Sequence, residues 1–241
     1  MRVGSPVQSD FVLQNFVAVF LDVMGTRDRL AELDAFPETP AERQAAVEIL
    51  RGTLGVVLDI REKLNEALDT TRRFSVGDAS TLPAELRDLY DFELKTFTVG
   101  FSDSFVLAVP LEEPEAPHKA LVAIGTLIAS AGSMMLDALS EGRALRGGID
   151  LAPGLHLDNG ELYGPALARP YVLESKCAEY PRIVVGDTLR EFLDHHARPG
   201  SGSHSENLAR KTAAKIVREH LCVDADGRTI VDWVPKMPPS A

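Results

Sequence analysis

Cysteine is scarce in this chain. Only Cys177 and Cys222 occur in 241 residues, so at most one disulfide bond can form and no cysteine spacing suits a metal site. Disulfide bonds are common in secreted proteins and rare in the cytosol. The cysteine usage therefore favours a reducing, cytoplasmic location.

Long apolar runs are also missing from the sequence. No uninterrupted run approaches the roughly 20 residues that a membrane-spanning helix needs, so we expect no membrane span. The short apolar run at residues 16–21 has Asp10 upstream and Asp22 directly after it. These acids do not fit a secretory signal.

Positive charge is in deficit, with 25 Lys and Arg against 36 Asp and Glu and a net charge of −11. A general nucleic-acid binder needs a basic surface, so that class is excluded, whereas an anionic substrate stays compatible if a metal or local cations offset its charge. The hydrophobic share of 45% is typical of a globular chain. We expect an N-terminal lead over residues 1–14 and a single domain over residues 15–241.

Hydrophobic periodicity predicts a mixed α+β fold. Thr39-Pro40-Ala41-Glu42 is a capping box that starts a long amphipathic helix. A long, partly irregular excursion follows over residues 69–91. Strands alternate with helices and include an internal hairpin, which suggests an α+β sandwich of the ferredoxin-like kind. The predicted strands are 16–21, 95–101, 104–109, 144–151, 182–185, 221–223 and 229–231. Besides the long helix, the predicted helices are 117–139, 163–178, 187–195 and 207–220.

Two acids stand where strands end. Asp22 closes the buried strand at 16–21, and Asp103 lies at the hairpin turn. In a split βαβ topology these strands are neighbours, so the two carboxylates can converge and bind hard divalent cations. The alternative is that Asp22 caps a helix and Asp103 only makes a turn. Met24-Gly25-Thr26 then leads into a helix whose N–H groups can hold a polyphosphate.

Four short motifs occur in a fixed order: Phe20-Leu21-Asp22-Val23-Met24-Gly25, Phe101-Ser102-Asp103-Ser104, Arg146-Gly147-Gly148-Ile149, and Gly164-Pro165-Ala166-Leu167 followed by Leu173-Glu174-Ser175-Lys176. With them, residues 15–187 resemble the class III nucleotidyl cyclase catalytic domain, most nearly the bacterial pyrimidine cyclases of Pycsar antiphage defence. The resemblance implies a cytoplasmic enzyme that converts a nucleoside triphosphate to a 3′,5′-cyclic monophosphate and pyrophosphate, using two divalent ions, Mn²⁺ or Mg²⁺. The product would signal to a separate cyclic-nucleotide-responsive effector.

The resemblance also implies residue roles. Asp22 and Asp103 match the metal-binding aspartates, Val23 would lend its carbonyl to a metal, and Met24-Gly25-Thr26 would line the triphosphate. Two metals about 3.5–4 Å apart can activate the attacking hydroxyl and neutralise the leaving group. The cyclases that this chain resembles share each active site between two subunits. A homodimer is therefore implied, in which the partner subunit supplies Glu161, Arg169 and Lys176.

Departures from the cyclase pattern bear on the substrate base. Val99 stands where purine cyclases usually have lysine, which weakens the case for ATP or GTP. Glu161 matches the acid that partners this lysine. A uracil ring offers an N3–H that Glu161 can accept, so UTP is the first choice and CTP the second.

Other departures bear on the chemistry of the helix at 163–178. Ala168 and Val172 stand where cyclases usually have asparagine and arginine, so another cation must stabilise the transition state. Arg169 and Lys176, about two turns apart on one side of this helix, are the candidates. They are equally compatible with an ordinary solvated helix surface, where ion pairs contribute little.

Two other classes of protein remain open. A haloacid-dehalogenase-type phosphatase would use Asp22 as its nucleophile, but Met24 stands where its general acid is expected. That hypothesis leaves the motifs at 101–104 and 146–149 unexplained. A non-catalytic cyclase-like module that binds a nucleotide or only dimerises is favoured by the missing asparagine and arginine and opposed by the two aspartates.

Overall fold

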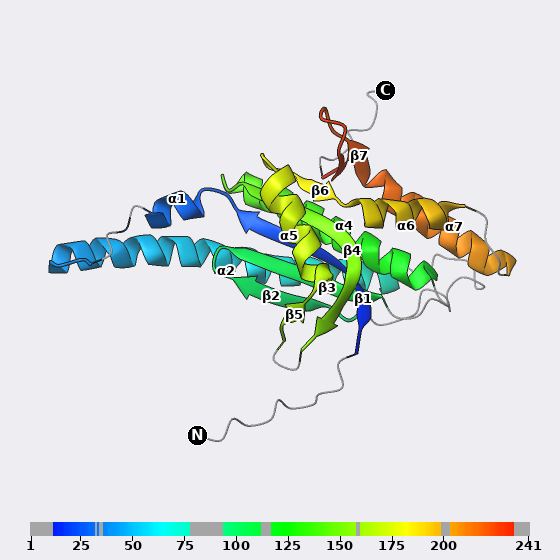
Figure 1. The fold of residues 1–241 in the computed structure, drawn as a ribbon, viewed down its shortest axis with the longest axis horizontal. Coiled ribbons are helices and arrows are strands. Elements are labelled where there is room, and N and C mark those ends of the chain that lie inside the picture. Colours follow the sequence, from blue (N-terminus) through cyan, green and yellow to red (C-terminus); the bar gives the residue numbers. More distant parts are fainter. Residues whose placement is uncertain are drawn as a thin grey trace, which may run out of the picture.

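The computed structural model describes residues 12–31, 33, 36–77, 94–111, 117–157, 160–198 and 203–233, with backbone only for residues 27, 67–77 and 101. Strands and helices are interspersed along these ranges (Figure 1). In chain order the elements are β1 (Gln14–Val23), α1 (Thr26–Ala31), α2 (Pro40–Gly77), β2 (Phe97–Phe101), β3 (Ser104–Leu111), α4 (Pro117–Ser140), β4 (Leu145–His156), β5 (Leu162–Tyr163), α5 (Pro165–Cys177), β6 (Ile183–Val185), α6 (Asp187–Ala197), α7 (His204–Glu219), β7 (Leu221–Val223) and β8 (Thr229–Val231).

One open sheet organises the fold. Its strands follow the order β2-β3-β1-β4-β6-β8-β7, and β5 pairs with β4 off this path. All pairs are antiparallel except β4 with β6. The predicted α+β class with an internal hairpin is confirmed. The order places β1 between β3 and β4, so that Asp22 has a strand on each side.

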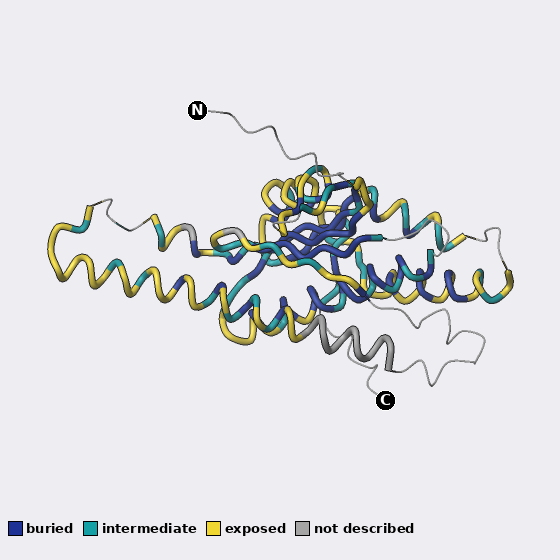
Figure 2. The backbone as a smooth tube through the Cα atoms, turned by 90° about the horizontal axis from the view of Figure 1, so that it is seen from below, coloured by how far each residue is buried: buried dark blue, intermediate teal, exposed yellow. Residues whose placement is uncertain are grey.

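The apolar run of β1 is continuous because helices cover the sheet on both faces. Alternate side chains point to opposite faces of a strand. Val17, Val19 and Leu21 join the large core beneath α4 and α2. Phe16, Ala18 and Phe20 join the smaller core on the other face, where α5 packs on β1 and β4. Figure 2 shows the strands as the most continuously buried part of the molecule.

Helix α4 corrects the expectation that no segment is long and apolar enough to span a membrane. By length and composition alone, this helix of 24 residues could cross a membrane, because Ser, Thr and Gly interrupt its apolar run without adding charge. However, 67% of the window concerned is buried inside the fold. Helix α4 packs between the sheet and helices α2 and α7, as a core helix does.

The capping box at the start of α2 is confirmed. The Glu42 N–H donates to Thr39 Oγ1 at 3.2 Å, and the Thr39 N–H donates to Glu42 Oε2 at 3.0 Å. Residues 69–77, expected in an irregular excursion, continue the helix, and the remainder of that excursion lies outside the described residues. The first half of α2 extends away from the sheet and is largely exposed (Figure 2). Its exposed apolar residues are Val47, Leu50, Leu54 and Leu58.

Some element boundaries differ from those expected. Helix α5 begins at Pro165, because Tyr163 pairs with Leu155 in the β5–β4 ladder. Helix α6 has Gly186 as its N-cap and runs two residues beyond the predicted end at 195. Strand β1 begins at Gln14, two residues before the predicted strand at 16–21.

His196 on α6 makes stability depend on pH. Its ring lies 4.3 Å from the ring of Phe192, and its buried Nδ1 has no hydrogen-bond partner among the described residues. Burial, with smaller contributions from His195 and Arg210, lowers the pKa of His196 from 6.5 to about 4. The unfolded chain therefore takes up this proton at a higher pH than the folded chain.

We expect the melting temperature to fall as the pH drops from 6.5 toward 4, because this contribution is fully present only above pH 6.5. Thermal unfolding followed by circular dichroism at several pH values would measure it. His196→Phe should flatten this dependence, whereas His204→Gln, at an exposed position, should not. An unchanged slope in His196→Phe would contradict the explanation.

Candidate active site

The sheet brings the two aspartates to one pocket. Asp22 pairs with Ser104 in the β1–β3 ladder, directly beside the turn that carries Asp103. Ser104 Oγ donates to Asp22 Oδ1 at 2.8 Å, and the Val23 N–H donates to the Asp103 carbonyl at 3.2 Å. Both aspartates line a pocket of about 630 Å³. The convergence expected from the topology is therefore present.

The turn after β1 is less open to a phosphate than its sequence indicates. Met24 and Gly25 line the aspartate pocket, with Gly25 at a φ of 81° that favours glycine. However, the Met24 N–H already donates to the Ala144 carbonyl at 2.9 Å. Thr26 is buried and lines a separate pocket of about 210 Å³ beside Arg143. Of the predicted Met24-Gly25-Thr26 segment, only the first two residues lie at the aspartate pocket.

Arg146 is the cation among the described residues that line this pocket. It lies opposite Asp22 in the β1–β4 ladder, and its Nε and Nη2 are each 3.3 Å from Asp22 Oδ2. Its Nε is also 2.7 Å from Glu174 Oε1. Arg146 thus joins a strand carboxylate to a helix carboxylate, and it lowers the repulsion between them.

Glu174 is almost completely buried, with a side chain only 4% exposed. Burial raises the pKa of Glu174, the charges of Asp22 and Asp103 raise it further, and Arg146 opposes the shift. A buried acid with a raised pKa at the edge of a polar pocket is a frequent feature of functional sites. The sequence motifs contain both Arg146 and Glu174, but the motifs alone do not indicate that these two residues pair.

Gly148 explains how Glu174 reaches Arg146. A Cβ on Gly148 would lie 2.3 Å from the Pro170 carbonyl oxygen and 2.5 Å from Leu173 Cβ, so helix α5 rests directly on β4. A Cβ on Gly147 would lie 2.5 Å from the Phe20 carbonyl oxygen. The close approach at Gly148 is what lets a side chain of α5 meet the arginine of β4.

Arg169 lies at a neighbouring pocket of about 1240 Å³. Its Nη1 donates to Thr188 Oγ1 at 2.7 Å and to the Leu151 carbonyl at 3.5 Å. This second pocket meets the aspartate pocket at residues that line both, namely Phe20, Ser102, Asp103, Ser104 and Tyr171. The two pockets therefore form one continuous depression along the sheet end and helix α5.

The remaining predicted residues lie elsewhere. Val99 is half-buried on β2 and packs against the smaller core. Glu161 is exposed just before β5, and Lys176 is exposed in the last turn of α5. None of these three is among the described residues that line the two pockets. A single chain therefore brings together Asp22, Val23, Met24, Gly25 and Asp103, but not the whole predicted set.

The donor set is compatible with a hard divalent cation. Asp22, Asp103 and the Val23 carbonyl offer only oxygen atoms, as Mg²⁺ and Mn²⁺ prefer. Across the described ranges, no three His, Cys, Asp or Glu side chains are grouped to hold a metal. Mg²⁺ is commonly bound by one or two carboxylates together with water and substrate phosphates. The pair Asp22 and Asp103 is compatible with this mode of binding.

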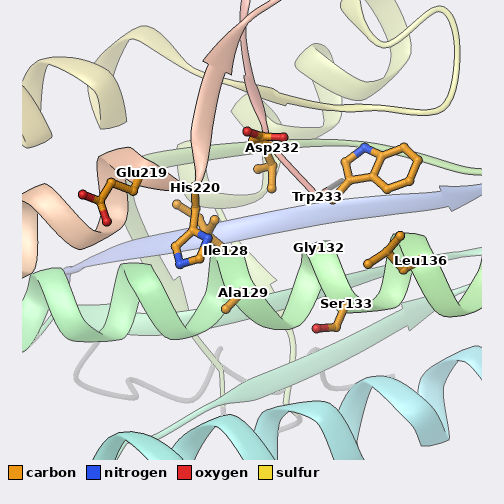
Figure 3. A pocket seen from close by; sticks show the side chains of 10 residues that line it. Ile128, Ala129, Gly132, Ser133, Leu136, Glu219, His220, Asp232 and Trp233 are labelled. Atoms are coloured by element: carbon orange, nitrogen blue, oxygen red, sulfur yellow. The ribbon is translucent and has the colours of Figure 1, made fainter. Parts of the chain in front are cut away.

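A third pocket, of about 570 Å³, lies between α4 and the C-terminal hairpin (Figure 3). Ile128, Gly132 and Leu136 form its floor, and Trp233 and His220 stand across from them. No residue predicted from the sequence for the site is among the described residues that line it. The third pocket therefore has no link to the chemistry that the motifs predict.

Comparisons with known proteins give structural likenesses only. No protein-family model matches the chain, and no curated protein matches it. The catalytic core of a rhodopsin-guanylyl cyclase with converted specificity, in complex with ATPαS, is similar at 12% identity and a TM-score of 0.46, over 77% of this chain and 84% of that one. A bacterial light-regulated adenylyl cyclase is similar at 11% identity and a TM-score of 0.37, over 78% of this chain and 47% of that one. The chain thus spans about half the length of the second protein.

Proposed function

We propose that this chain is a class III nucleotidyl cyclase that converts a pyrimidine nucleoside triphosphate, UTP before CTP, to its 3′,5′-cyclic monophosphate and pyrophosphate. The observation that carries the proposal is the pair Asp22 and Asp103 in one pocket beside the Met24-Gly25 turn. A helix-cap role for Asp22 is disfavoured, because Asp22 lies within β1 and α1 begins only at Thr26.

Divalent ions bound at the pair would activate the 3′-hydroxyl and offset the charge of the leaving pyrophosphate. The chain's own residues orient the carboxylates for this task. Ser104 and Arg146 hold the two oxygens of Asp22, and Glu174 holds Arg146 from the buried side. Arg146 also prevents the acidic pocket from repelling a triphosphate as strongly as it otherwise would.

The proposed pyrimidine preference rests on two positions. Val99 supplies an apolar side chain where purine cyclases usually have lysine, and Glu161 offers an acceptor for the uracil N3–H. In this proposal both act on a nucleotide held mainly by the other subunit. The cyclic product would serve as a cytoplasmic second messenger in antiviral defence, read by a separate effector.

A second copy of the chain would complete the site. Helix α5 and strand β5 expose apolar side chains at the pocket that Arg169 lines: Tyr163 is 68% exposed, Tyr171 51% and Val172 44%. Aromatic and apolar side chains exposed together favour an interface. A twofold dimer that covers this face would bring the partner's cationic helix toward the aspartate pocket and form two equivalent sites.

We expect the purified chain to form cyclic UMP from UTP in the presence of Mn²⁺, with less cyclic CMP from CTP. Incubation with each of the four ribonucleoside triphosphates, followed by mass identification of the products, would test this. Cyclic products from ATP or GTP only would overturn the pyrimidine choice and leave the cyclase class standing. Orthophosphate without a cyclic product would favour the phosphatase, and nucleotide binding without any product would favour a non-catalytic module.

A further inference from the structure

Helix α2 contacts the turn that carries Asp103 through one side chain. Arg61 Nη2 lies 3.4 Å from the Ser102 carbonyl oxygen and 3.3 Å from the Ser104 carbonyl oxygen, and it donates to both. These carbonyls flank Asp103 in the chain. A single guanidinium from a helix distant in sequence therefore holds both ends of the turn.

The turn is a place where such support matters. Ser102 has a φ of 39°, in the left-handed region that a residue with a side chain adopts at an energetic cost. Ser104 is also the residue whose hydroxyl donates to Asp22, and the Asp103 carbonyl accepts from the Val23 N–H. Movement of the turn would therefore shift both aspartates at once.

Gly100 on β2 makes room for the guanidinium. A Cβ at Gly100 would lie 2.3 Å from Arg61 Cζ and 2.5 Å from each of its Nη atoms. The planar group thus lies flat against the strand, with its Nε buried and without a partner among the described residues. Gly100 has no left-handed backbone conformation to preserve, so the close approach of Arg61 is what requires a glycine there.

We infer that Arg61 is a positioning residue of the active site: it fixes the Asp103 turn in register with Asp22 and so couples the long helix α2 to the carboxylate pair. The expected effect of Arg61 on turnover rests on the proposed cyclase function. The contact of Arg61 with the Asp103 turn does not depend on that function. Arg61 acts through the turn, and it is the carboxylates that would touch metal and substrate. No local sequence pattern indicates this role, because 41 residues separate Arg61 from Ser102.

The test combines Arg61→Ala with Gly100→Ala. Arg61→Ala should raise the Mn²⁺ concentration for half-maximal turnover by about tenfold or more, as the loss of a residue that orients metal ligands commonly does. Gly100→Ala should do the same in the wild-type background, because the new methyl group displaces the guanidinium. In the Arg61→Ala background, Gly100→Ala should have no further effect, since the displaced group is already gone. Arg61→Lys should show a smaller loss than Arg61→Ala, because lysine keeps a charged donor. The rescue should be incomplete, because an ammonium group cannot reproduce the planar fork of arginine.

The matched control is Arg51→Ala, on the same helix, where Arg51 is 74% exposed and makes only a 3.9 Å pair with Glu48. It should leave the Mn²⁺ requirement unchanged. Additive losses for Arg61→Ala and Gly100→Ala, or an unchanged Mn²⁺ requirement in a folded Arg61→Ala chain, would overturn the inference.

Amide exchange of Val23 separates this inference from the proposed function. Its N–H bonds to the Asp103 carbonyl, so Arg61→Ala should accelerate its exchange by about tenfold or more if the turn loosens. The readout needs no enzymatic activity. A wild-type chain that makes no cyclic nucleotide would refute the cyclase proposal, while unchanged Val23 exchange in Arg61→Ala would refute the role of Arg61.

Discussion

Asp22→Asn and Asp103→Asn are each expected to lower cyclase turnover by at least about 100-fold, the order of loss when a carboxylate that holds a catalytic metal is neutralised. Asparagine keeps the size of aspartate and can still accept from Ser104 in place of Asp22. The substitution therefore removes charge while it preserves packing. Product quantified by mass spectrometry, with circular dichroism to verify folding, would measure the loss.

Asp137→Asn is the matched control, because Asp137 is an exposed acid on α4, away from the aspartate pocket. It should retain full turnover. If Asp103→Asn also retained near wild-type turnover in a folded chain, the carboxylate pair could not be the catalytic centre. In that case the pocket would need another chemical role.

Mixing two inactive variants is expected to restore activity. Asp22→Asn removes a residue of the aspartate pocket, whereas the double variant Arg169→Ala, Lys176→Ala removes cations that we assign to the partner subunit. In a mixed dimer one of the two sites has both halves intact. Equal amounts that exchange freely give half mixed dimers, so activity should approach about one quarter of the wild-type value.

Lys176 is the more informative half of the double variant: among the described residues it lines neither pocket, whereas Arg169 lines the neighbouring pocket together with Asp103 of the same chain. Subunit exchange can be followed with two chains of different mass tags. Background activity after verified exchange would contradict the shared site. The cations that act on the nucleotide would then have to come from the same chain as Asp22, with Arg146 the first to examine.

The core of the site was predictable because its signals are local. An apolar run that ends in Asp22 and a hairpin with Asp103 at its turn are each readable over a few residues. Antiparallel pairing of these strands then brings the acids together, as the register of Asp22 with Ser104 shows. The order of the four motifs adds the neighbouring strand β4 and helix α5.

What the sequence did not predict depends on contacts between distant elements. Glu174 meets Arg146 only because Gly148 lets α5 rest on β4, and Arg61 reaches the Asp103 turn only because α2 lies beside the β2–β3 hairpin. Thr26 follows a glycine turn that is typical of a phosphate loop, yet it is buried. The helix through residue 77 includes Thr70 and Thr71, whose weak helix propensity favoured an earlier end.

The stoichiometry of products tests the central claim most directly. Wild-type chain incubated with UTP and Mn²⁺ should release cyclic UMP and pyrophosphate in equal amounts, because cyclisation joins the 3′-oxygen to the α-phosphorus and expels the other two phosphoryl groups together. Both products can be quantified in one reaction, and both should fall to background with Asp103→Asn. Release of orthophosphate in place of pyrophosphate, or of pyrophosphate without an equal amount of cyclic UMP, would contradict the account.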